Sequence, residues 1–214
     1  MQVTQRRSLS AVDERRESRR QSLLDAALEL FATRGYLASP IEDLCRAAHV
    51  STKSFYGIYE SREQCYLDLM RRTTEHLLET MTAAVVAEGF DDVAAAERRL
   101  LTTFARLMGG DPRVATVLFG RGTATTFAVE AERRANRRRT ADLIALIWSL
   151  SQVTQEQADG IATGVVGGLF DIVADWVAGS DELEVLDPAV LERRLIAFYQ
   201  AVTAGIRIGK ENLS

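Results

Sequence analysis

The 214-residue sequence contains few of the residues that break helices, form disulfides or bind metals: 3 prolines, 2 cysteines and 2 histidines. With 47% apolar and 26% charged residues, this composition fits a soluble, mostly helical protein. The two cysteines, Cys45 and Cys65, have no metal-type spacing, so we expect reduced, packed thiols. The sequence contains no Ser-His-Asp set, metal cluster or phosphate-binding loop. This lack argues against an enzyme and predicts neither a metal nor a cofactor.

Long apolar runs are also missing, since none reaches the roughly 18 residues that a membrane span needs. The arginines near the N-terminus are not followed by an apolar segment, so no secretory signal is predicted and the expected location is the cytoplasm. Strand-like alternation and internal repeats of roughly 20–50 residues are absent from the sequence. The predicted fold class is therefore all-α.

Charge is distributed unevenly along the chain, although the net charge is only -4. Residues 1–62 carry 10 Arg/Lys and 8 Asp/Glu, whereas residues 63–214 carry 16 and 22. A basic end on an acidic body indicates that the N-terminal part meets a polyanion. A small excess of arginine is also found on ordinary solvated surfaces.

Apolar spacing divides the chain into an arm, a head and a body. Residues 1–17 have no sustained periodic spacing of apolar residues and are expected to form a mobile basic arm. The arginines of this arm either enter a DNA minor groove or make no contact with DNA. Residues 18–63 are expected to form a three-helix head, and residues 64–214 a larger helical body. The helices predicted for the body cover residues 62–87, 93–108, 112–119, 123–150, 155–177 and 188–208.

The head contains two short helices around a turn at His49-Val50. Ser39 and Pro40 predict the start of the first helix, since serine caps free N–H groups and proline suits the first helical position. Ser51 is expected to cap the second helix, residues 52–58, with Phe55 facing inward. A helix-turn-helix places its second helix in the DNA major groove. Spacing alone leaves open that these are two packing helices of an all-helical protein.

An ordered series of residues runs through this stretch: Leu30-Phe31, Gly35-Tyr36, Leu44-Cys45, Ala48-His49-Val50-Ser51, Phe55-Tyr56, Tyr59 and Ser61-Arg62-Glu63. In this order they resemble the N-terminal domain of the tetracycline-repressor (TetR) family. The resemblance implies a homodimeric transcriptional regulator, expected to be a repressor that leaves its palindromic operator when a small-molecule effector binds. The residues expected to contact double-stranded DNA are Ser39, Ser51, Thr52, Lys53, Ser54, Tyr56, Tyr59 and Arg62.

Three positions depart from the family pattern. Glu42 stands where some relatives present a basic side chain, and His49 replaces the usual turn glycine. Gly57 leaves an outward position without a side chain. We therefore expect the family's geometry without a borrowed sequence specificity.

The resemblance also implies a dimer interface formed by the last two helices. Glycines inside a helix cost roughly 1 kcal/mol each relative to alanine, and close approach of another backbone is one use of that cost. The alternative is packing of the same face within one chain. The expected interface residues are Gly160, Gly164, Gly167, Leu191, Leu195, Phe198 and Val202.

An effector pocket in the body is implied by the resemblance, while the sequence offers only candidates for its lining: Phe104, Met108, Phe119, Phe127, Trp148, Phe170, Asp171 and Trp176. Aromatic residues with this spacing also occur in ordinary cores. Such a lining would suit an apolar or aromatic effector, and an acid such as Asp171 would favour a cation. A DNA-independent helical ligand-binding or scaffold dimer is the alternative function.

Overall fold

The computed structural model describes residues 11–89, 92–120, 126–149, 155–179 and 186–211. Within these ranges the chain is helical and has no strand, which confirms the all-α prediction. The helices are α1 (Ala11–Arg34), α2 (Ile41–Ala47), α3 (Thr52–Tyr56), α4 (Arg62–Glu88), α5 (Val93–Gly110), α6 (Pro112–Phe119), α7 (Phe127–Ser149), α8 (Gln155–Ala178) and α9 (Pro188–Glu211).

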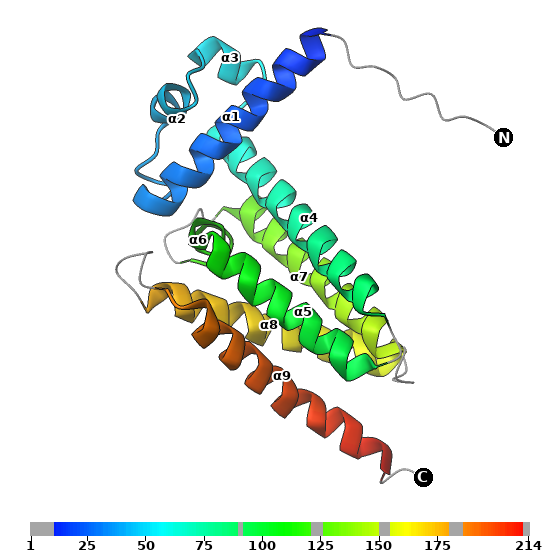
Figure 1. Cartoon of the computed structure of the whole chain (residues 1–214). Helices are drawn as coiled ribbons and strands as arrows, with labels where there is room; N and C mark the ends of the chain where they lie inside the picture. The colour runs from blue at the N-terminus through cyan, green and yellow to red at the C-terminus, as the bar shows by residue number, and fades with distance from the viewer. Residues whose placement is uncertain (1–10, 90–91, 121–125, 150–154, 180–185, 212–214) are drawn as a thin grey trace, which may run out of the picture.

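Helices α1, α2 and α3 form a head at one end of the molecule, and α4 runs from this head along the body (Figure 1). In the body, α4 packs against α5 and α7, α8 packs against α6, α7 and α9, and α5 packs against α9. The short helix α6 contacts α1, so it joins the head to the body. The head therefore meets the body through two elements, α4 and α6.

The head has an aromatic core. The ring centroids of Phe31, Tyr36 and Tyr66 lie 5.4 Å from one another, within the favourable range for aromatic pairs. The hydroxyl of Tyr66 donates to the carbonyl oxygen of Val117 in α6 at 2.8 Å. Because Tyr66 belongs to α4, this one side chain ties together the head core, α4 and α6.

The start of α1 contradicts part of the predicted arm, because residues 11–17 are helical. The apolar residues of this segment show no helical spacing. Its helix is instead held by Glu17, which forms ion pairs with Arg72 of α4 and with Arg20 one turn along α1. A polar helix held by such pairs carries no hydrophobic pattern, so the sequence reading missed it. Residues 1–10, with Arg6 and Arg7, lie outside the described residues, as do residues 123–125 and 150 at the ends of the predicted seventh helix.

The helix ends in the head follow local sequence preferences, and the predicted Ser51 cap is confirmed. Gly35 ends α1 with φ of 80°, and His49 adopts the left-handed conformation with φ of 55°. The side-chain oxygens of Ser51 and Ser61 accept from the backbone N–H groups of Ser54 and Gln64, capping α3 and α4. The second short helix ends at Tyr56 rather than at residue 58, with Gly57 as its C-cap.

The predicted capping role of Ser39 is wrong. Pro40 is the N-cap of α2, and no side chain caps that helix. Ser39 is fully buried, and its hydroxyl hydrogen-bonds to the carbonyl oxygens of Leu30 at 3.2 Å and Gly35 at 2.8 Å. It therefore satisfies the C-terminal end of α1 instead of the start of α2.

Both cysteines are free and buried, as predicted for packed thiols. Burial raises the pKa of the Cys45 and Cys65 thiols, that of Cys65 to about 12. Reactive thiols require the thiolate, so neither cysteine has the properties of a redox or catalytic group.

Helix α8 contains one segment, Gly160–Ala178, that is long and apolar enough to cross a membrane by length and composition. Its mean hydropathy is 1.6, although Asp171 and Asp175 interrupt it. A core helix of a helical bundle passes the same test, and α8 packs against α6, α7 and α9 with 39% of the segment buried.

Candidate functional site

Helix α3 presents a polar outer face. Thr52 and Lys53 are exposed, Tyr56 is 57% exposed, and Ser54 is half-buried. On the opposite side Phe55 is fully buried in the head core, with its ring 5.7 Å from that of Tyr59. One buried aromatic therefore orients α3 so that its hydroxyl and ammonium groups face outward, as a helix entering a groove requires.

The remaining predicted contact residues differ in their availability. Ser51 is exposed, but its hydroxyl oxygen is used to cap α3 and lies 2.9 Å from that of Ser54. Gly57 is exposed, and a Cβ added there would meet only ordinary contacts at 3.5 and 3.6 Å. No steric requirement therefore forbids a larger residue at this outward position.

Three predicted phosphate contacts serve the interior of the head instead. The side chain of Ser39 is buried, and Tyr59 is 5% exposed with its hydroxyl donating to Asp68 Oδ2 at 2.5 Å. Arg62 Nη1 donates to the carbonyl oxygen of Ser39 at 2.9 Å, and its guanidinium lies 4.2 Å from the ring centre of Tyr36. These three residues lie in the helix-turn-helix region, as predicted. Their polar groups, however, form hydrogen bonds within the head rather than pointing toward DNA.

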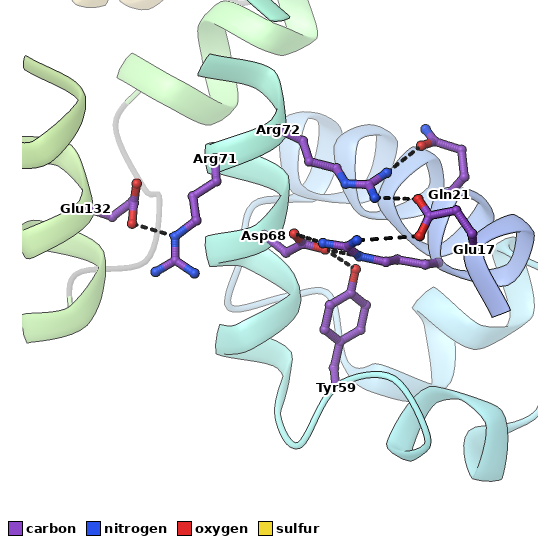
Figure 2. A network of polar contacts seen from close by, with 8 residues as sticks. Glu17, Gln21, Tyr59, Asp68, Arg71, Arg72 and Glu132 are labelled. Atoms are coloured by element: carbon purple, nitrogen blue, oxygen red, sulfur yellow. Dashed lines mark hydrogen bonds and ion pairs between the residues drawn. The ribbon is translucent and has the colours of Figure 1, made fainter. Parts of the chain in front are cut away.

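Asp68 of α4 is the centre of a polar network that reaches α1 and the loop after α3 (Figure 2). Arg20 donates to both carboxylate oxygens of Asp68, from Nε at 2.7 Å. Burial by itself raises the pKa of Asp68, but the hydrogen bonds from Arg20 and Tyr59 outweigh it and lower the pKa overall. Burial together with the bond to Asp68 raises the pKa of Tyr59, which stays protonated and donates. Arg20, which lies just beyond the predicted basic arm, is therefore used within the head.

A second part of the network joins α4 to the body. Arg71 Nε donates to Glu132 Oε2 of α7 at 2.7 Å, as Figure 2 shows, and Arg139 Nη2 donates to Glu132 Oε1 at 2.6 Å. Glu132 is only 6% exposed, and its two arginine partners compensate its charge. Asp68 and Arg71 are three residues apart on α4, so one turn of this helix contacts both the head and α7.

The body contains a partly open cavity of about 200 Å³ between α4, α5, α6, α7 and α8. Four of the predicted pocket residues line it: Phe104, Phe119, Phe170 and Asp171. The rings of Phe119 and Phe170 lie 4.6 Å apart and form one apolar wall with Phe104. Asp171 is exposed, which places it at the rim.

The other four predicted pocket residues do not line this cavity. Met108 is fully buried in the core and is not among the lining residues, and Phe127 is 87% exposed. The indole N–H of Trp148 donates to the hydroxyl of Tyr199 at 2.7 Å, and that of Trp176 donates to the carbonyl oxygen of Asp187 at 3.2 Å. Both tryptophans therefore anchor α9 or the segment before it.

Sequence analysis missed the arginines of the cavity, which lie on α7. Arg133, Asn136, Arg137 and Thr140 line it at steps of three, four and seven, the spacing of one helix face. The same spacing test that locates apolar faces would have separated Arg133 and Arg137 from the exposed Arg138.

The predicted dimer residues fall into three groups. A Cβ added at Gly160, Gly164 or Gly167 would meet nothing within 4 Å, so none of the described residues packs against these glycines. Leu191 and Leu195 are fully buried within the subunit, which contradicts their assignment to an interface between subunits. Phe198 and Val202 are half-buried, and Phe198 packs against Gly168, which the prediction did not include.

Comparison with known proteins bears on both parts of the chain. Residues 23–69 match the sequence model of the family described as bacterial regulatory proteins, tetR family. The HTH-type transcriptional repressor KstR2 of Rhodococcus jostii is 30% identical over 100 residues, 47% of this chain and 48% of that protein. The HTH-type transcriptional activator FasR of Mycolicibacterium smegmatis is 26% identical over 76% of this chain and 74% of its own. The first match thus spans about half the length of that relative.

The fold is shared along nearly the whole chain. The crystal structure of the transcriptional regulator FadR of Bacillus subtilis, in complex with stearoyl-CoA, superposes with a TM-score of 0.67 and 16% identity. The superposition covers 85% of this chain and 97% of that one. At this identity the likeness shows the fold, and the relatives found are regulators rather than enzymes. Residues 23–69 thus match the head of the tetR family of bacterial regulatory proteins, and the chain as a whole has the fold of such regulators.

Proposed function

We propose that the protein is a homodimeric, ligand-responsive transcriptional regulator that reads a palindromic operator through α3. The observation that carries the proposal is the division of α3 into a buried Phe55 and an exposed face with Thr52, Lys53 and Tyr56. These side chains offer hydroxyl and ammonium donors of the kind that contact base edges and phosphates. Acting on DNA, such a regulator would work in the cytoplasm.

Dimerisation is proposed through the open glycine face of α8 together with Phe198 and Val202 of α9. Gly160 and Gly164 are one helical turn apart and lack a packing partner in the part of the chain that the structure describes, which leaves room for a second backbone. Two-fold related heads would match two half-sites about 34–36 Å apart or a multiple of that distance. This arrangement explains why an all-helical body would keep unfavourable glycines on its surface.

The cavity is proposed as the effector site, and repression relieved by the effector as the mode of action. Helix α4 lines the cavity with Met70 and Thr74, and Asp68 and Arg71 lie on the same turn of this helix as Met70. A ligand that shifts α7 against α4 would therefore act on the helix that carries the head. Such a ligand changes DNA affinity only if it binds one arrangement of the heads better than the other.

The test is selection of bound sites from random duplex DNA with the full chain, followed by titrations with the selected duplex. We expect a two-fold symmetric site and a steep loss of affinity with added salt. Replacement of Lys53 by alanine should weaken binding and reduce the salt slope by about one if the ammonium contacts a phosphate. Arg134→Ala, which removes the same charge from the exposed face of α7, should leave both quantities unchanged.

Selection that enriches no sequence would contradict DNA recognition and favour a DNA-independent ligand-binding or scaffold protein. Single, non-palindromic sites would count against the dimer. Equal affinity of the Lys53→Ala variant and the parent protein for every selected duplex would remove α3 as the reading helix.

A further inference from the structure

Two polar atoms beside the cavity are buried and lack a hydrogen-bond partner among the described residues: Asn136 Oδ1 and Arg137 Nε. Asn136 is 6% exposed and Arg137 is half-buried, and both lie on the α7 face that lines the cavity. Buried polar groups in proteins are nearly always hydrogen-bonded, because an unpaired one costs the full penalty of its desolvation. The pair therefore marks a place where a bound molecule would complete the hydrogen bonding.

The charge of Arg137 indicates the sign of that molecule. No described residue forms an ion pair with its guanidinium, whereas Arg71 and Arg139 on the same side of the body share Glu132. A partly desolvated guanidinium is best satisfied by an oxyanion, through charge-assisted hydrogen bonds. Rotation of the Asn136 side-chain amide exchanges Oδ1 for the Nδ2 donor, which would give the same oxyanion a second hydrogen bond.

The size and lining of the cavity indicate the rest of the ligand. An apolar cavity of roughly 150 Å³ is enough to hold benzene, and this one has about 200 Å³. Phe104, Phe119 and Phe170 form an apolar wall with Leu100 and Leu169. This space suits a compact apolar body and excludes a bulky polar group such as a nucleotide.

We propose that the cavity binds a compact organic carboxylate, with its apolar body among the phenylalanines and its carboxylate at Arg137 and Asn136. The inference rests on the proposed function only in taking this cavity as the effector site. Asp171 at the rim carries the opposite charge and is exposed, so its field is screened by solvent more than that of the half-buried Arg137. This charge distribution favours an anionic effector, whereas Asp171 alone led us to expect a cationic one.

The test uses the full-length protein without DNA and isothermal titration with three probes of one chain length: octanoate, octanamide and octylammonium. We expect octanoate to bind at least about 10-fold more tightly than either of the others, as a charge-assisted hydrogen bond implies. Octanoyl-coenzyme A serves as a fourth probe, because it carries the same chain on a headgroup too large for the cavity.

Variants locate the site. Arg137→Gln should weaken octanoate binding by about 10- to 100-fold, whereas Arg138→Gln, the same change one residue along on an exposed position, should leave it unchanged. Asn136→Leu should weaken octanoate binding and also raise the melting temperature of the ligand-free protein, since it removes an unpaired buried polar group. A loss of binding through misfolding would instead lower that temperature.

Equal binding of octanamide, tighter binding of octylammonium, or no measurable binding of octanoate would each overturn the proposal. So would binding of octanoyl-coenzyme A alone, since the headgroup would then be recognised outside the cavity. DNA binding is measured separately, so an intact operator complex with any of these outcomes would leave the proposed regulator standing and remove only the carboxylate site.

Discussion

The Nε atom of Arg71 lies 2.7 Å from Oε2 of Glu132, so a half-exposed arginine of α4 is bound to a buried carboxylate of α7. Glu132 immediately precedes Arg133 on α7, and Arg71 follows Met70 on α4; Arg133 and Met70 both line the cavity. Asp68, one turn earlier on α4, holds Arg20 and Tyr59 of the head. A continuous set of contacts therefore runs from the cavity to the head.

Replacing Arg71 by glutamine is expected to uncouple the two sites. Arg139 still compensates Glu132, so the fold should survive with a loss of about 1 kcal/mol in the free energy of unfolding. The measurement is operator affinity with and without saturating octanoate, whose ratio typically falls between roughly 5 and 150 in coupled systems. That ratio should approach one in Arg71→Gln and stay at the parent value in Arg138→Gln. A parent-like ratio in both variants would exclude this ion pair as the link.

Stability should depend on pH through Asp68. Its pKa is lowered in the folded state, so its contribution is present above its unfolded pKa of about 4 and is lost as pH falls through the folded pKa. Asp68→Asn should destabilise the protein by about 1–3 kcal/mol at pH 7, because Arg20 and Tyr59 lose a charged acceptor.

Urea unfolding of parent and Asp68→Asn at several pH values measures this effect, and the difference between them should shrink below about pH 4. Asp25→Asn, an exposed change on α1, is the control with little expected effect at any pH. A difference that persists unchanged in acid would show that Asp68 acts through packing rather than charge.

Two glycines of α8 should respond oppositely to alanine. At Gly168 the added Cβ would lie 2.3 Å from Phe198 Cζ, so Gly168→Ala should lower the free energy of unfolding by about 1–3 kcal/mol through overpacking. At Gly164 the position is open, and alanine should favour the helix by up to about 1 kcal/mol.

The same pair tests the proposed dimer. If a second subunit packs on the open face, Gly164→Ala should weaken self-association in sedimentation equilibrium despite its better helix propensity. Unchanged association together with higher stability would show that this face meets solvent. Because each variant adds the same methyl group, the comparison separates helix propensity from packing.

Ser39→Ala should lower the stability of the protein and leave the salt dependence of DNA binding unchanged. The hydroxyl is buried and bonded to the carbonyl oxygens of Leu30 and Gly35, so its loss should cost about 1–3 kcal/mol in thermal or urea unfolding. The salt slope of operator binding should match that of the parent protein. A reduced slope would mean that Ser39 reaches a phosphate after all, whereas Thr52→Ala, on the exposed face, should weaken DNA binding without this loss of stability.

Features that depend on a few neighbouring residues could be predicted from the sequence. The left-handed ends at Gly35 and His49, the caps at Ser51 and Ser61, and the inward Phe55 all follow from backbone geometry and helix periodicity within a few positions. These local preferences were enough to define the helix-turn-helix and most helix boundaries of the body.

Features that depend on distant partners were decided by the tertiary structure. Tyr59 and Arg20 are turned inward by Asp68, which lies 9 and 48 residues further along the chain, although both have the chemistry of phosphate contacts. Leu191 and Leu195 carry the apolar pattern of any interface, but burial within the subunit assigns them to its own core. The spacing along α7 places Arg137 and Asn136 on one face, yet only the packing of α4, α5 and α8 around that face makes it the wall of a cavity. A residue's type and spacing determine which interactions it can form, and the elements packed around it determine which of them it does form.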